Sequence, residues 1–158
     1  MKSSFKKDFP IFEDRDFIYF DNASTTFKPK QVIDQVINFY TAHTSNVARG
    51  NNKLVEITSL AFEGVREKVA AFIGSKKSEI VFALNGTDAI NLLADGLKLN
   101  EEDEVILSSL EHHSACLPFI MKCKTTFVNL TEKGVIDLEH LRLCITKKTK
   151  LIIITYVS

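Results

Sequence analysis

Residues 79–114 read EIVFALNGTDAINLLADGLKLNEEDEVILSSLEHHS, and they contain the clearest indication of the fold class. The spacing of its apolar residues changes along the chain. Residues 79–84 and 104–108 are short apolar runs of strand length, whereas residues 87–99 place Ile90, Leu93, Ala94 and Leu97 on one face of a helix. The order strand, helix, strand predicts an α/β fold.

The same alternation continues toward the carboxyl terminus. We expect helices over residues 114–122 and 138–145, the latter capped by Asp137, and strands over residues 125–130 and 150–156. The sheet should therefore be mostly parallel with flanking helices. The uninterrupted apolar run 151–154 is typical of a strand buried on both faces.

The amino-terminal part predicts helices. Residues 1–16 form an arm, and a short apolar run at 17–20 stops at Asp21-Asn22, a turn signal. Pro29 fits the first turn of a helix that carries Val32, Val36 and Tyr40. After a polar loop over residues 41–53, a long helix should run over residues 54–73, with Gly74 as its cap.

The composition excludes several classes of protein. The 158 residues contain 20 basic and 20 acidic side chains, so the basic footprint of a nucleic-acid binder is absent. No stretch approaches the ~18 apolar residues of a membrane span. The three cysteines are far apart, without CxxC or paired zinc spacing, which favours structural thiols and a reducing, cytoplasmic location.

Asn85-Gly86-Thr87-Asp88 lies where a predicted strand ends and a predicted helix begins. Free backbone N–H groups and the helix dipole make such a junction suitable for a phosphate group, and Gly86 allows close approach while Thr87 adds a hydroxyl donor. The alternative is a plain helix cap, with Asp88 disfavouring phosphate unless its carboxylate points away. There is no GxGxxG or GxxxxGK[ST], which disfavours dinucleotides and nucleoside triphosphates.

Glu111-His112-His113-Ser114 follows the second strand of the quoted stretch. An imidazole at this edge could stack on an aromatic ring or move a proton. The alternative is that the histidines are loop residues that cap the next helix with Ser114. No metal site is predicted, because further ligands at zinc spacing are missing. His43 and His140 fall on helix faces and are interpreted as structural.

Two further polar loops are candidates for ligand contact. The small-residue turn at 21–26 includes Asn22 and Ala23, and it could approach a ligand or be only a turn. Arg49, before Gly50, could clamp a carboxylate, although a solvated surface arginine explains it equally well.

Taken together, these segments resemble the class V aminotransferase family of pyridoxal 5'-phosphate (PLP) enzymes, and most closely the group II cysteine desulfurases and selenocysteine lyases. In order, the matching stretches are YFDNASTT (19–26), KP (28–29), QVID (31–34), RG (49–50), NGTDAINL (85–92), EHHS (111–114) with PF (118–119), GVIDL (134–138) and TYVS (155–158). Three positions depart from the family pattern, which often has histidine at Ala48, asparagine at Cys116 and tryptophan at Phe119.

The resemblance implies the N-terminal part of the fold type I large domain over residues 17–158, incomplete and ending before the lysine that forms a Schiff base with PLP. It implies that Gly86 and Thr87 hold the cofactor phosphate and that His112 stacks on the pyridine ring. It places Asn22, Ala23 and Arg49 on the substrate side. No catalytic residue is expected within this chain, since the lysine and the persulfide cysteine should lie beyond Ser158.

The resemblance also implies a function for the parent protein. It would convert L-cysteine to L-alanine, pass sulfur to an acceptor protein for iron–sulfur cluster assembly, and form a homodimer, whereas the 158 residues alone should be inactive. Two alternatives stay open. One is another class V enzyme, such as an aminotransferase, a selenocysteine lyase or a kynureninase-like hydrolase, and the other is a non-catalytic truncated remnant.

Overall fold

A computed structural model describes residues 4–15 and 17–157. The chain divides into two compact units, residues 1–80 and 81–158. None of the helices in the described ranges is long and apolar enough to cross a membrane.

Unit 1 is helical. Two short 3-10 helices, η1 (Ser4–Asp8) and η2 (Pro10–Phe12), precede α1 (Lys30–Ala42), α2 (Lys53–Ile73) and the 3-10 helix η3 (Lys77–Glu79). Asn52 caps α2 by accepting hydrogen bonds from two backbone N–H groups, and Gly74 ends it in the left-handed conformation, with φ 71°. The predicted helices and the Gly74 cap are therefore confirmed.

Aromatic rings order the segment that leads to α1. Phe12, Phe17, Phe27 and Tyr19 form a chain of contacts, in which the Tyr19 and Phe27 rings stack with centroids 4.1 Å apart. The Tyr19 hydroxyl donates to the carbonyl oxygens of Asp21 and Thr25, which closes the turn between them. Contacts among these half-buried rings stabilise a segment that has little regular secondary structure.

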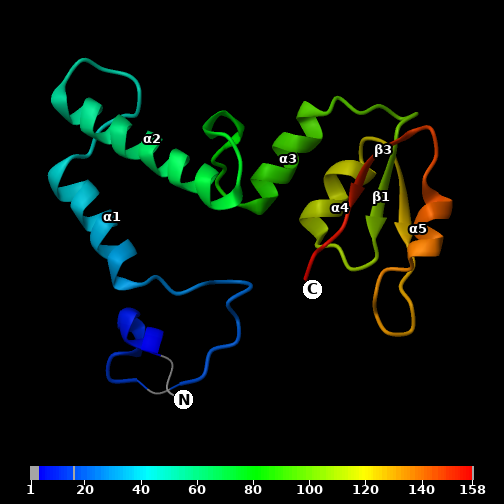
Figure 1. Cartoon of the computed structure of the whole chain (residues 1–158), viewed down its shortest axis with the longest axis horizontal. Coiled ribbons are helices and arrows are strands. Elements are labelled where there is room, and N and C mark those ends of the chain that lie inside the picture. The colour runs from blue at the N-terminus through cyan, green and yellow to red at the C-terminus, as the bar shows by residue number, and fades with distance from the viewer. Residues whose placement is uncertain (1–3, 16, 158) are drawn as a thin grey trace. The chain divides into compact units, whose positions relative to one another are not determined.

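Unit 2 is a parallel three-stranded sheet with helices (Figure 1). Its elements are α3 (Gly86–Gly96), β1 (Glu104–Ser108), α4 (His113–Ile120), β2 (Lys124–Val128), α5 (Leu138–Cys144) and β3 (Thr149–Ile153). The strand order is β2-β1-β3, so β1 is central. The crossover from β1 to β2 runs opposite to the return from β2 to β3, and right-handed crossovers therefore place α4 and α5 on opposite faces, as Figure 1 shows.

The core of unit 2 lies between β1 and the pair α3 and α4. It is formed by buried side chains from these three elements and the turn after α4: Ala94, Val105, Leu107, Cys116, Phe119 and Cys123. An ion pair between Asp95 and Lys122 joins the carboxyl ends of the two helices. This packing holds α3 and α4 side by side in the same direction.

Two predictions about strands were wrong. Residues 80–84 form no strand, and Val81 and Leu84 are 78% and 91% exposed, because no described strand lies beside them to complete a hydrogen-bond ladder. The run at 151–154 is not buried on both faces either. β3 lies at an edge of the described sheet, and its Ile152 is 39% exposed, whereas all five residues of β1 are buried.

Candidate functional site

The candidate site lies at the carboxyl edge of the sheet in unit 2. The three strands are parallel, so the segments that leave them meet at one edge. Figure 1 shows that α3 and α4 both begin at this same end of the unit. The structure therefore brings the start of α3, which carries Gly86 and Thr87, to the same edge as His112, which precedes α4.

Two side chains accept backbone hydrogen bonds at the start of α3. The Asn85 side chain accepts from the Asp88 N–H at 2.9 Å, and the Asp88 carboxylate accepts from the Leu84 N–H at 3.0 Å. The carboxylate is thus directed back along the chain onto a backbone donor. The interpretation of Asn85 as a helix cap is correct, and the concern that Asp88 would repel an anion is reduced.

Three donors remain at this corner. In the described part of the chain, the N–H groups of Gly86 and Thr87 and the Thr87 hydroxyl make no hydrogen bond. A Cβ added to Gly86 would meet no described atom within 4 Å, so neither packing nor backbone conformation inside the chain requires glycine there. The corner has open space, unused donors and the positive end of a helix dipole, which suits a phosphate group.

His112 is the N-cap of α4. Its Nδ1 accepts a hydrogen bond from the Ser114 N–H at 3.2 Å and lies 2.8 Å from the Ser114 hydroxyl oxygen. The alternative interpretation, in which a histidine caps the helix together with Ser114, is therefore correct. It is compatible with stacking, because the cap engages the ring edge at Nδ1, fixes the orientation of the imidazole and leaves the side chain exposed.

The loop that carries His112 is tied to both neighbouring strands. The Ser109 hydroxyl donates to the carbonyl oxygen of Val128, the last residue of β2, at 2.9 Å. The Glu111 carboxylate accepts from the N–H and the hydroxyl of Thr155, both at 2.7 Å, just after β3. Sequence reasoning noted Glu111 only as part of a motif and missed this pairing, since 44 residues separate the partners.

The described residues contain no candidate metal site, and two of the three thiols are buried. Within residues 4–15 and 17–157, no group of three His, Cys, Asp or Glu side chains could hold a metal ion. All three cysteines are free thiols, and burial raises the pKa of Cys116 and of Cys123. His140 acts structurally, since its Nδ1 accepts from the Asn129 N–H at 3.0 Å.

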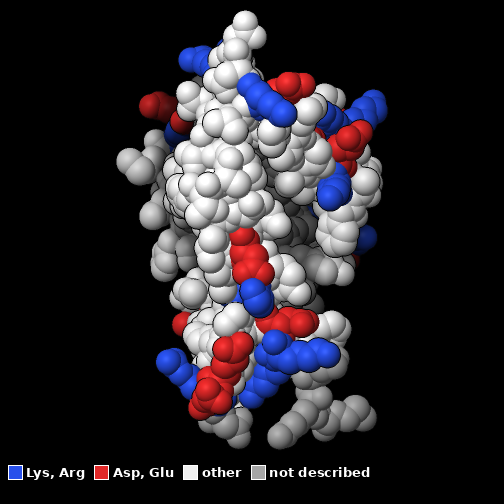
Figure 2. All heavy atoms as spheres, turned by 90° about the vertical axis from the view of Figure 1, so that its left-hand side faces the viewer, with Lys and Arg blue, Asp and Glu red and all other residues white. Residues whose placement is uncertain are grey.

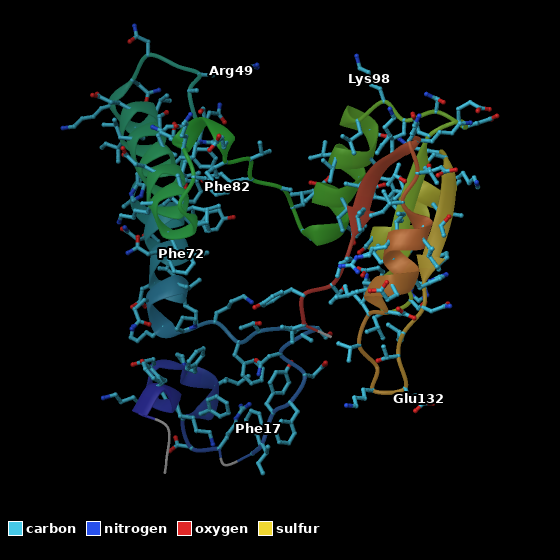
Figure 3. All side chains as sticks on the ribbon, turned by 45° about the vertical axis from the view of Figure 1, so that its right-hand side comes forward. Phe17, Arg49, Phe72, Phe82, Lys98 and Glu132 are labelled. Atoms are coloured by element: carbon cyan, nitrogen blue, oxygen red, sulfur yellow. The ribbon has the colours of Figure 1, made fainter. Side chains whose placement is uncertain are left out.

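The remaining predicted site residues belong to unit 1. Asn22 and Ala23 are exposed in a turn held by the Thr25 N–H, which donates to the Asp21 carbonyl at 3.0 Å. Arg49 is exposed on the loop between α1 and α2 (Figure 3). Ala48 and Gly50 on either side of it have positive φ angles of 62° and 135°. A site shared between these residues and unit 2 stays a prediction.

Comparisons with known proteins identify relatives. The sequence model of the family aminotransferase class-V matches residues 18–158. A probable cysteine desulfurase from Synechocystis sp. is 36% identical over 100% of this chain, and one from Streptomyces coelicolor is 33% identical over 97%. The chain spans 41% of the length of each of these relatives.

Solved structures of cysteine desulfurases also align with almost the whole of this chain. The apo structure of a cysteine desulfurase from Thermococcus onnurineus aligns with 96% of this chain at a TM-score of 0.85 and 32% identity, and the match covers 39% of that protein. A cysteine desulfurase from Escherichia coli aligns with 95% of the chain at a TM-score of 0.78 and 28% identity, covering 40% of that protein.

Proposed function

This chain belongs to the class-V aminotransferase family, and from that premise we propose that its parent protein is a PLP-dependent cysteine desulfurase. The relatives that cover almost the whole chain carry that activity in their names. The proposed reaction converts L-cysteine to L-alanine and transfers the sulfur atom to an enzyme cysteine as a persulfide. When bound, PLP supplies an electron sink for the amino acid substrate.

One observation carries the proposal: unused phosphate donors and an oriented imidazole occupy the same carboxyl edge of the sheet. Gly86 and Thr87 would hold the phosphate through two backbone N–H groups and one hydroxyl. His112 would lie against the pyridine ring, with its orientation fixed by the cap on Ser114. This edge is where ligands of parallel α/β sheets bind.

Residues of unit 1 would complete the substrate side. Asn22 and Ala23 lie in an exposed turn, and the exposed guanidinium of Arg49 is suited to a substrate carboxylate. The domain organisation that we propose is an arm over residues 1–16 followed by part of the large domain. As partners we propose L-cysteine, an acceptor protein that takes the sulfur toward iron–sulfur clusters, and a second copy of the protein, in the cytoplasm.

The test is to express the product of the complete gene and to measure its visible PLP absorbance and the alanine released from L-cysteine. Bound PLP together with alanine formation in equal amount to transferred sulfur supports the proposal. A protein that binds no PLP contradicts it. Bound PLP with amino transfer but no alanine release from cysteine would identify a different member of the family.

A further inference from the structure

We propose that Glu111 is a positioning residue, which sets the orientation of His112 by holding its loop against the segment that follows β3. The inference rests on the proposed function, because it concerns the edge where the cofactor would bind. It assigns to Glu111 a role in aligning the imidazole, without contact between its carboxylate and a ligand.

The contacts of Glu111 use both of its carboxylate oxygens. Oε2 accepts from the Thr155 hydroxyl and Oε1 accepts from the Thr155 N–H, each at 2.7 Å. Oε1 also accepts from the hydroxyl of Ser108, the last residue of β1, which is only 2% exposed. Three donors therefore fix one side chain, and hydrogen bonds to an ionised acceptor are stronger than neutral ones.

These contacts restrain the loop from one side, and Ser109 restrains it from the other. The Ser109 hydroxyl holds the end of β2 while Glu111 holds the chain after β3, so the four residues between β1 and α4 are anchored to both neighbouring strands. His112 follows Glu111 directly, and its Nδ1 is bound to Ser114 at the start of α4. The imidazole plane is thus set by a backbone that is anchored immediately before it and immediately after it.

The chemistry of the contact explains why a carboxylate is needed. Thr155 presents two donors, an N–H and an O–H, to one side chain. Glutamine has a similar length, but its NH₂ group would force the Thr155 hydroxyl to change from donor to acceptor, and the remaining hydrogen bonds would lose their charged acceptor. Glu111→Gln therefore weakens the contact without changing side-chain volume, whereas Thr155→Ser keeps both donors and should preserve it.

Glu104 provides a matched control at the opposite end of the same strand. Its carboxylate also accepts from a threonine near β3, the Thr146 hydroxyl at 2.6 Å, and from Lys124 at 2.9 Å. Glu104→Gln damages a comparable link between strands but lies away from the edge that carries His112. It should lower thermal stability while leaving the orientation of a bound cofactor unchanged.

The experiment compares wild type, Glu111→Gln, Thr155→Val, Thr155→Ser and Glu104→Gln, each made in the product of the complete gene. The measurements are thermal unfolding, PLP affinity, the visible circular dichroism of bound PLP, and, for the variants that retain Thr155, amide hydrogen exchange at that residue. We expect Glu111→Gln and Thr155→Val to weaken PLP binding about tenfold and to change its circular dichroism. In Glu111→Gln, exchange at Thr155 should also become faster.

Wild-type affinity and circular dichroism in both Glu111→Gln and Thr155→Val would overturn the inference. Equal changes of the dichroism in Glu104→Gln would also overturn it, because they would show a general loss of stability. If Glu111→Gln does not fold, Thr155→Val against Thr155→Ser gives the same comparison. A wild-type protein without PLP would instead overturn the proposed function itself, which separates the two failures.

Discussion

The four residues from Asn85 to Asp88, at the start of α3, have two different roles in the proposed phosphate site. The Asn85 side chain accepts from the N–H of Asp88, the third helical residue, and the Asp88 carboxylate accepts from the N–H of Leu84. Gly86 and Thr87, between them, are left with donors that the described chain does not use. Because these hydrogen bonds already fix the backbone at the start of α3, binding of a ligand there needs little further ordering of the chain.

Thr87→Val tests whether the Thr87 hydroxyl binds the cofactor phosphate. The change removes one hydroxyl donor and keeps the size of the side chain, so we expect PLP retention to weaken by ~1–3 kcal/mol. Spectrophotometric titration of the apo protein with PLP measures the affinity. Thr87→Ser is the control, because it retains the hydroxyl and should bind nearly as well as wild type. Unchanged affinity in Thr87→Val would remove Thr87 from the proposed phosphate site.

Gly50, beside Arg49, is the glycine for which packing and backbone both require the absence of a side chain. Its φ is +135°, and an added Cβ would lie 2.9 Å from Cγ2 of Val55. Gly50→Ala should therefore destabilise the protein by roughly 1–3 kcal/mol, measured by urea unfolding. In Gly64→Ala, within α2, the added Cβ meets nothing within 4 Å, and the change should be stabilising by about 0.4–1 kcal/mol. The reverse order of stabilities would contradict this explanation.

At the scale of elements, β1 organises unit 2. It pairs in parallel with β2 on one side and β3 on the other, and its five residues are all buried. Glu104 at its first position is tied to β2 through Lys124 and to the segment before β3 through Thr146. The first residue of the strand thus links the three strands, while Val105 and Leu107 contribute to the core.

The Glu104 links predict a dependence of stability on pH. The hydrogen bond from Thr146 and then that from Lys124 lower the pKa of Glu104 below its ordinary value of 4.5. Since the folded pKa is the lower one, this stabilisation is complete above about pH 4.5 and is lost as pH falls through the folded pKa. Melting temperatures measured against pH should fall less steeply below pH 4.5 in Glu104→Gln than in wild type. Parallel curves would show that the links contribute nothing.

The sequence predicts local features of these elements better than their partners. β1 and its bounds were predicted because its apolar run is bounded by acidic and serine residues. The strand expected at residues 79–84 was wrong, since apolar composition cannot supply a neighbouring strand. The position of His112 was predicted correctly from the end of β1, whereas Thr87 was placed at this edge from the end of a strand that the structure does not contain. The Glu111–Thr155 contact depends on the order β2-β1-β3, which no local pattern reveals.

At the scale of the whole molecule, large apolar side chains remain on the surface of the described chain. On α1, Val36 is 52% and Tyr40 is 71% exposed, and Figure 2 shows a broad area without charged residues on the side that carries α1 and α2. Such areas on proteins are typical of surfaces that other protein segments cover. A second copy of the protein, as proposed above, is one candidate for that role.

The three thiols of the molecule should differ in reactivity. Cys116 and Cys123 lie in the core of unit 2, where burial raises the pKa of each thiol, while Cys144 on α5 is partly exposed. Iodoacetamide at neutral pH should therefore modify Cys144 at least about tenfold faster than the other two. Peptide mass spectrometry measures the three rates, and addition of denaturant should make them equal. Equal rates in the native protein would contradict the burial described for Cys116 and Cys123.

The position of β1 in the sheet has a consequence for biosynthesis. The ribosome releases β1 before either of its neighbours, and its partners begin 20 and 45 residues later, at Lys124 and Thr149. A nascent chain therefore holds its fully buried strand without both of its partners until both crossovers have been translated. Parallel pairing over such sequence distances is slow. Protection of this strand during synthesis, by a chaperone or by transient packing of α3 and α4, would thus limit aggregation before the sheet can form.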